Sequence, residues 1–224
     1  MIRWWVATAL LTGVTVACAQ STSFRLVRGV VTYSSSDGKE HEIAIGKRCA
    51  DLWTNRDGSV AAFIAVEKER PPWGPAGESF IEESSVFIAR KSDDFRPIHI
   101  AVDIELDGRR WRTAREPKVS PDYSTLYFFV PDFMTSWALI GKPLAGGEPR
   151  LIGRGTDYCV VWGGRNSGDL GILTSFEPQE PWRGVSHPCY MRASSGTMTK
   201  IADECADFER LTGQWSRERG GTCR

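Results

Sequence analysis

The chain has 224 residues, of which 41% are apolar, enough to build a hydrophobic core for one domain or two small ones. Lysine plus arginine and aspartate plus glutamate both number 28, so the sequence lacks the positive excess that non-specific nucleic-acid binding requires. Nine tryptophans are many for this length, and any that lie outside the core are candidates for a binding surface.

The N-terminus has the pattern of a signal peptide. Met1–Arg3 is positively charged, an apolar stretch follows, and Ala17-Cys18-Ala19 supplies the small residues that a signal peptidase reads. We therefore expect a signal peptide over residues 1–19 and a periplasmic or secreted mature protein without a transmembrane segment. Lipidation of Cys18 is the alternative, which Thr15 disfavours because lipoprotein signals usually carry leucine there.

Secretion places the cysteines where disulfides persist. Five cysteines remain after loss of the signal peptide, so at least one is unpaired or pairs between chains. Three of them crowd the C-terminal segment, and we expect a bridge among Cys189, Cys205 and Cys223. No Cys-x-x-Cys motif occurs and the three histidines are scattered, so the sequence predicts no metal site and no cofactor.

Strands separated by turns are predicted for most of the chain. The run Val60–Val66 contains no charge, which is typical of a strand buried on both faces. The Asp107-Gly108 turn should place Trp111 on a returning strand, and the segment around Trp73 is rich in proline and glycine, so it should be an exposed loop. Other strands are expected over residues 24–33, 42–45, 84–89, 97–102 and 184–191, and the last should be an edge strand because Pro188 lies near its middle.

An internal repeat organises the middle of the chain. Asp57-Gly58-Ser59 aligns with Asp122-Tyr123-Ser124, and an apolar strand follows each turn. Further on, Val86–Arg90 aligns with Ala138–Lys142, and the first unit is longer only by its proline-rich loop. A third, weaker copy takes Cys159–Trp162 as the buried strand, with a Gly-Gly turn and a further strand over residues 169–173.

These repeats resemble those of the TolB-type propellers, the periplasmic relatives of WD-repeat proteins. Ser120–Ser124 keeps most of the Ser-Pro-Asp-Gly-like turn that opens such blades, although Tyr123 stands in place of glycine. The resemblance covers residues 50–175 and implies a propeller-like β fold and an envelope protein as partner. Closed propellers have about four or more blades, and three copies are visible, so a small propeller, an open stack and a β-sandwich with propeller-like turns are all open.

The C-terminal segment changes to a helical pattern. Apolar side chains at spacings of three, four and seven share one face, and Ser195 or Thr197 can cap the start; these side chains are Met198, Ile201, Cys205, Phe208 and Trp215. We expect a mostly β fold with one C-terminal amphipathic helix. The predicted division is a signal peptide (1–19), a propeller-like domain (20–193) and a helix with a tail packed on that domain (194–224).

No constellation of catalytic residues is apparent. Gly-x-Ser-x-Gly is absent, and the paired acids Glu82-Glu83 and Asp93-Asp94 are expected in turns, where solvated charge is usual. We therefore predict a non-enzymatic protein-binding module, for example an antagonist of an envelope-acting toxin, whose site lies on loops at one end of the strands. The candidate binding residues are Trp73, Asp157, Tyr158, Trp162 and Arg165.

Two other functions are compatible with the sequence. A carbohydrate-binding module could stack sugar rings on exposed Trp73, Trp111 or Trp182. An envelope hydrolase could use aspartates or glutamates that the sequence does not single out. A glycan is therefore the alternative partner to a protein.

Overall fold

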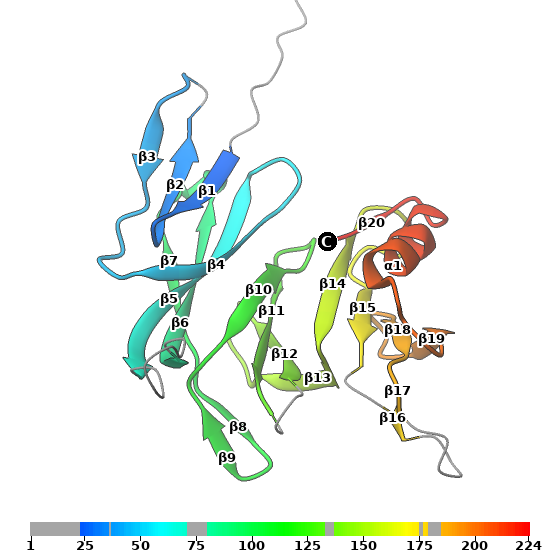
Figure 1. Cartoon of the computed structure of the whole chain (residues 1–224). Coiled ribbons are helices and arrows are strands. Elements are labelled where there is room, and N and C mark those ends of the chain that lie inside the picture. The colour runs from blue at the N-terminus through cyan, green and yellow to red at the C-terminus, as the bar shows by residue number, and fades with distance from the viewer. Residues whose placement is uncertain (1–22, 36, 71–79, 133–136, 175–176, 179–184) are drawn as a thin grey trace, which may run out of the picture.

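Four antiparallel sheets of three to five strands make up most of the protein and follow one another along the chain (Figure 1). The computed structural model describes residues 23–35, 37–70, 80–132, 137–174, 177–178 and 185–224. The predicted signal peptide, Trp73 and Trp182 fall outside these residues. No helix within the described ranges is long and apolar enough to cross a membrane. The mostly β fold with one C-terminal helix is confirmed.

Three of the sheets contain a four-stranded antiparallel meander and are here named blades I to III; in blade III a hairpin is inserted between the second and third strands. Blade I contains β4 (Cys49–Thr54), β5 (Val60–Arg70), β6 (Phe80–Arg90) and β7 (Ile98–Ala101). Blade II contains β10 (Arg115–Val119), β11 (Thr125–Pro131), β12 (Trp137–Pro143) and β13 (Arg150–Gly155). Blade III contains β14 (Asp157–Trp162), β15 (Leu170–Leu173), β18 (Cys189–Arg192) and β19 (Met198–Ala202), and β20 (Thr222–Cys223) pairs with the other side of β14.

The remaining elements lie before, between and after the blades. The first sheet contains β1 (Ser23–Val27), β2 (Val30–Ser34) and β3 (Glu40–Glu42). The inserted hairpins are β8 (Ile104–Leu106) with β9 (Arg109–Trp111), and β16 (Glu177–Pro178) with β17 (Val185–Ser186). The helical elements are the 3-10 turn η1 (Lys91–Asp93) and the helix α1 (Phe208–Arg217). Trp111 therefore lies on a returning strand, as predicted.

The turn between the first two strands is the same in blades I and II. The Asp57 carboxylate accepts a hydrogen bond from the backbone N–H two residues later at 2.9 Å, and Asp122 does the same at 3.1 Å. Gly58 and Tyr123 occupy the same left-handed position, with φ of 66° and 57°. The predicted alignment of these two turns is confirmed.

Alternate side chains of the second strands face different neighbouring sheets. In β5, Ala62 and Ile64 pack toward blade II, whereas Phe63 packs toward the first sheet. In β11, Phe128 faces blade I and Phe129 faces blade III. The uninterrupted apolar runs of these strands therefore reflect burial on both faces, as the sequence predicted.

The row of sheets is covered differently at its two ends. The face of the first sheet that points away from blade I is polar. On that face Arg25, Thr32 and Glu42 are register partners. At the other end, Phe208 and Leu211 of α1 pack on blade III. Figure 1 shows the first sheet and α1 on opposite sides of the molecule. The architecture is thus an incomplete propeller whose last blade is covered by a helix instead of another blade.

Two disulfides fasten blade III. Cys189 and Cys205 form one bridge, with Cα atoms 5.5 Å apart, which confirms a bridge among the three C-terminal cysteines. Cys223 pairs with Cys159 on β14, with Cα atoms 5.4 Å apart. The chain end is therefore tied to the first strand of the blade through β20. Cys49 is a buried free thiol.

The predicted C-terminal helix begins too early. Met198–Ala202 is a strand that pairs with β18, and the helix starts only at Phe208, where the Asp207 side chain accepts a hydrogen bond from the N–H of Arg210 at 2.9 Å. Ser195 and Thr197 are therefore not helix caps. Met198, 45% exposed, also lies outside the apolar face that the pattern assigned to it.

Three strand predictions also need correction. Residues 24–33 form two strands, because Arg28 and Gly29 make a tight turn with φ of 51° and 80°. The strand predicted around Pro188 starts after that proline and lies between β15 and β19, so it is not an edge strand. The third repeat is misaligned by one strand, since β14 is the counterpart of β4 and β10, and β15 of β5 and β11.

Candidate functional site at the inner strands

The first strands of the three blades, β4, β10 and β14, lie beside one another and are here called the inner strands (Figure 1). Contacts between these strands join residues near the start of one strand to residues near the start of another, and residues near the end of one to residues near the end of another. Glu116 of β10 is bonded to Asp51 of β4, whereas Trp53 at the end of β4 contacts Trp162 at the end of β14. The inner strands therefore present two separate groups of side chains, one at each end.

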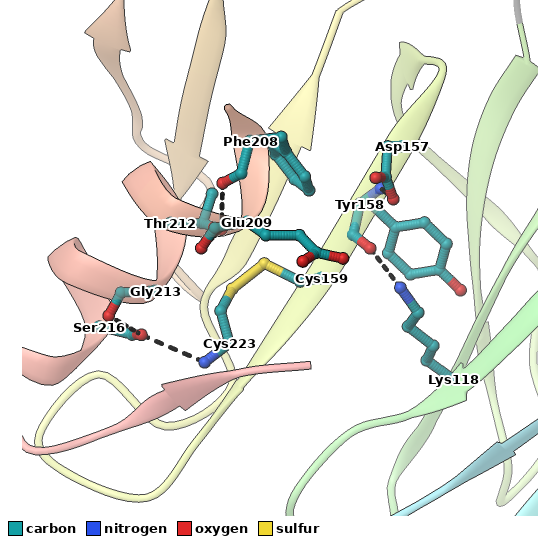
Figure 2. Close-up of a disulfide and its surroundings, with 10 residues drawn as sticks. All are labelled: Lys118, Asp157, Tyr158, Cys159, Phe208, Glu209, Thr212, Gly213, Ser216 and Cys223. Atoms are coloured by element: carbon teal, nitrogen blue, oxygen red, sulfur yellow. Dashed lines mark hydrogen bonds between the residues drawn. A yellow bond between two sulfur atoms is a disulfide. The ribbon is translucent and has the colours of Figure 1, made fainter. Parts of the chain in front are cut away.

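Lys118 occupies the starting end. Its ammonium donates a hydrogen bond to the backbone carbonyl of Tyr158, as Figure 2 shows, and lies 4.2 Å from the centroid of the Tyr158 ring. Burial lowers the pKa of Lys118, and the nearby carboxylates of Asp157, Glu116 and Glu209 partly oppose that effect. The cation is thus held between a carbonyl, a ring face and three acids.

The pKa values of two of these acids are also shifted. Burial raises the pKa of Asp157, which Lys118 partly offsets. Burial also raises the pKa of Glu116, and here Arg115 and Lys118 both act in the opposite direction. Glu209 points from α1 toward β14 across the Cys159–Cys223 bridge (Figure 2). Shifted groups gathered in this way are typical of functional sites, although ion-pair networks also produce them.

Glu116 also has an unusual backbone. Its φ is 52°, it precedes Pro117, and it sits at the bulge of β10. Its N–H donates to the Asp51 carboxylate at 2.9 Å, and its carbonyl accepts a hydrogen bond from the Tyr158 hydroxyl. Both neighbouring inner strands therefore hold this conformation in place.

A cavity of about 370 Å³ opens between β14, α1 and the chain end. Its charged lining consists of Lys118, Asp157, Glu209, Arg217 and Arg224, and the Cys159–Cys223 bridge forms part of its wall. Such a lining can hold a polar or charged ligand and can move protons between an amine and carboxylates. Within the described residues no trio of potential metal ligands occurs.

The finishing ends of the inner strands carry aromatic rings. Trp162 lies 5.7 Å from Trp53 and 6.0 Å from Tyr123, measured between ring centroids. The guanidinium of Arg90 lies 5.8 Å from the centre of the Tyr123 ring. We call Trp53, Arg90, Tyr123 and Trp162 the aromatic end.

Three N–H groups of the aromatic end lack a partner in the part of the chain that the structure describes. Trp53 Nε1, Arg90 Nε and Trp162 Nε1 are buried and have no acceptor among the described residues. Buried donors are normally satisfied, by protein or by water, so each unpaired group calls for an explanation. Their grouping in one place, from blades I and III, makes this end a candidate for binding an acceptor.

The predicted binding residues are distributed over both ends. Asp157 starts β14 beside Lys118, and Trp162 ends the same strand at the aromatic end. Tyr158 is fully buried, with its hydroxyl directed at the carbonyls of Glu116 and Tyr127, so its role is in packing. Arg165 is exposed in the loop after β14, and Trp73 lies outside the described residues.

Several residues of these sites escaped the sequence analysis: Trp53, Arg90, Glu116, Lys118, Tyr123 and Glu209. Trp53 and Tyr123 could have been singled out from the sequence. Both belong to the repeated strand-and-turn unit, and that unit does not itself require an aromatic residue at either position. Lys118 could not have been singled out, since its burial depends on β14 and α1, which are remote in sequence.

Comparison with family models and with curated proteins found no match. Among solved structures, the tricorn protease aligns with 83% of this chain and 16% of its own, at a TM-score of 0.54 and 13% identity. The β-propeller domain of the Trilobed protease from Pyrococcus furiosus aligns at 0.46, with 9% identity over 82% of this chain and 53% of its own. A gluconolactonase from Xanthomonas campestris aligns at 0.44, with 21% identity over 82% and 58%.

This chain therefore spans only part of the proteins that it resembles. At such low identity the likeness shows a propeller fold alone and carries no activity. The propeller part of the predicted resemblance is supported, and the TolB-type assignment stays a prediction.

Proposed function

We propose that this protein is a non-enzymatic binding module of the periplasmic or secreted space, which holds an envelope or secreted protein at its aromatic end. An antagonist of an envelope-acting toxin is one form that such a role could take. The propeller fold supplies a rigid frame for this role, because the site residues lie at strand ends and in short turns of three blades.

The three unpaired N–H groups carry the proposal. Leaving a buried donor unsatisfied costs about 1–3 kcal/mol. A partner that displaces the groups covering Trp53, Arg90 and Trp162 and brings a carbonyl or carboxylate oxygen to them recovers that energy. Tryptophan, tyrosine and arginine are also the residues that dominate the binding energy of protein interfaces. The residue types and the unpaired donors thus both favour a protein partner that supplies a hydrogen-bond acceptor.

The loop after β14 extends this surface and is already fixed in shape. Gly163 and Gly164 adopt φ of 76° and 67°. A Cβ on Gly164 would collide with the backbone carbonyl of Arg219, so the loop rests directly on the C-terminal segment. A pre-shaped loop loses little conformational entropy on binding. Arg165 extends from it into solvent without an ion pair in the described structure.

The test is affinity capture from envelope extract after light cross-linking, with the retained proteins identified by mass spectrometry. Wild type and the Trp111→Ala control, changed on the β9 hairpin, should retain the same dominant protein. Trp162→Ala and Arg90→Gln should lose it, and titration calorimetry with the purified partner should show affinity lowered about tenfold or more. Equal retention by all four proteins would contradict the proposal. Retention on polysaccharide instead would favour the carbohydrate-binding alternative.

A hydrolase is the second candidate, favoured by the cavity around Lys118 and its shifted acids. Hydrolysis of generic esters, peptides and glycans should be measured for wild type, Lys118→Met and Asp157→Asn. An activity lost in both variants and kept in Trp162→Ala would establish this candidate. If no substrate is turned over, the binding role remains as the one candidate function.

A further inference from the structure

Two adjoining cavities form one groove along the seam between blades II and III, which we call the seam groove. The first has a volume of about 510 Å³ and lies between the turn after β10 and the loop after β14. The second, of about 420 Å³, lies between the face of blade II and the turn after β18. Thr125, Tyr127, Arg192 and Ser194 line both cavities, so the two are continuous. Volumes of this size are typical of ligand sites.

The seam groove begins beside the aromatic end. Its inner part is lined by Asp122 and Ser167. Asp122 directly precedes Tyr123, and Ser167 belongs to the loop that follows Trp162. A partner that contacts the aromatic end can therefore continue outward into the groove without leaving the surface.

Two arginines that have no ionic partner among the described residues line this path. Arg192 is half-buried and borders both cavities, and Arg150 is exposed at the outer end. Neither side chain forms a hydrogen bond or ion pair with any described residue. Arg90 and Arg165, toward the aromatic end, also lack a carboxylate partner in the described structure. A half-buried guanidinium without a counter-charge favours an anionic ligand.

One acid lines the groove, and its charge is already engaged. The Asp122 carboxylate accepts hydrogen bonds from the Ser120 hydroxyl at 2.6 Å and from the backbone N–H of Ser124 at 3.1 Å. Both bonds belong to the repeated turn, so Asp122 has a structural role that does not depend on the arginines. The net charge of the groove lining is therefore positive, in a chain whose positive and negative side chains are equal in number.

We infer that the seam groove binds an extended, carboxylate-bearing segment of the protein partner, and this inference rests on the proposed function. Arg192 and Arg150 would each receive a carboxylate, and side-chain hydroxyls along the groove would bond the backbone between them. A peptide fits better than an acidic sugar, because Tyr127, the only aromatic ring in the described lining, packs against Gly141 and Ile152. A lining with one half-buried ring offers little aromatic surface on which a sugar could stack.

The inference can be tested with a fluorescent peptide of alternating aspartate and glycine, followed by anisotropy with the mature protein. A peptide with asparagine in place of aspartate and a uronic-acid oligosaccharide are the comparison ligands. The protein variants are Arg150→Gln with Arg192→Gln, and Arg109→Gln as a control on the exposed β9 hairpin. Thermal unfolding of each variant confirms that the fold is kept.

We expect the aspartate peptide to bind wild type and the Arg109→Gln control equally. The double variant should bind it at least about tenfold more weakly, and added salt should weaken binding to wild type more than to the double variant. Equal binding of the asparagine peptide, equal binding by the double variant, or no binding of the aspartate peptide would each overturn the inference. Tighter binding of the oligosaccharide with the same arginine dependence would overturn it too, and would assign the groove to a glycan.

These outcomes are separable from those of the proposed function. If protein capture depends on Trp162 while the aspartate peptide fails to bind, only the seam groove inference falls. If the peptide binds through Arg150 and Arg192 while Trp162→Ala retains the partner fully, the aromatic end is not the partner's site and the proposed function falls.

Discussion

The ammonium of Lys118 lies 4.2 Å from the centre of the Tyr158 ring and donates a hydrogen bond to the carbonyl of the same residue. One side chain of β10 thereby contacts both the ring and the backbone of one residue of β14. Burying a cation is unfavourable because the cation loses its contacts with water. The contacts with Tyr158 and the surrounding acids together offset that loss. The charges at the starting end therefore depend on one another.

Replacing Lys118 should change the titration of its neighbour. In Lys118→Met the pKa of Asp157 should rise further above its ordinary value, because the cation that lowers it is gone and the burial that raises it is kept. Carbon-13 NMR of the side-chain carboxyls measures this directly. Lys39→Met, at an exposed turn, is the matched control and should leave Asp157 unchanged. A lowered pKa in Lys118→Met would contradict the assignment.

Neutralising Asp157 should stabilise the protein at neutral pH. Its pKa is raised in the folded state, so the native protein holds this proton more tightly than the unfolded chain does. The ionised form is therefore unfavourable above the folded pKa, and that cost disappears as pH falls toward the ordinary value of 3.8. In Asp157→Asn the amide oxygen can still accept the hydrogen bond that the Tyr158 N–H donates to the Asp157 carboxylate at 2.6 Å.

Urea unfolding measures this effect. Asp157→Asn should have the larger free energy of unfolding at pH 7, and the difference from wild type should shrink on acidification toward pH 4. Exposed Asp203→Asn should show no such trend. A variant that is less stable at pH 7 would show that the pairing of Asp157 with Lys118 outweighs its burial.

The hydroxyl of Tyr158 should matter for stability. It is fully buried and faces the carbonyls of Glu116 and Tyr127. Tyr158→Phe leaves these carbonyls without that donor and should cost about 1–3 kcal/mol in the free energy of unfolding. Tyr33→Phe is the control, since its hydroxyl has no hydrogen bond among the described residues and its loss should cost under about 0.5 kcal/mol. Equal costs would contradict this role.

The two disulfides should contribute unequally. Cys159–Cys223 closes a loop with a sequence separation of 64, against 16 for Cys189–Cys205. Loop entropy predicts losses of about 4 and about 3 kcal/mol when each pair is changed to serine. Urea unfolding of the two double variants checks the order, and Cys49→Ser, at the free thiol, reports the effect of altering a buried cysteine that forms no bridge. The reverse order would show that strain or residual structure outweighs loop length.

Local signals were sufficient for blades I and II. Asp57 and Asp122 bind the N–H two residues later within their own turns, so the repeat is visible in the sequence. The apolar runs of β5 and β11 are equally local. The helix prediction failed because Met198 and Ile201 fit a helical spacing, whereas pairing with β18 makes their segment a strand. Tertiary contacts override a short periodic pattern in this way.

The site could be predicted only in part. Trp162 was a candidate because it ends an apolar strand, but its neighbours Trp53 and Tyr123 come from other blades. Lys118 reads as one charged residue of an ordinary strand, and nothing local indicates that Tyr158, at a sequence separation of 40, will cover it. Burial of a charge arises from assembly of the fold, which a pattern along the chain does not record.

The helix that covers blade III and the polar face of the first sheet have a consequence for how such chains can change. A ring of blades has a set circumference, so adding one blade alters every angle between neighbours. A row with its own cover at each end has no such limit, because stability there is roughly a sum of units and their interfaces. A further blade inserted between blades I and II would leave both covers and the Cys159–Cys223 bridge intact but would separate Trp53 from Trp162. This architecture can therefore vary in length while its ends stay the same, but only with loss of the aromatic end.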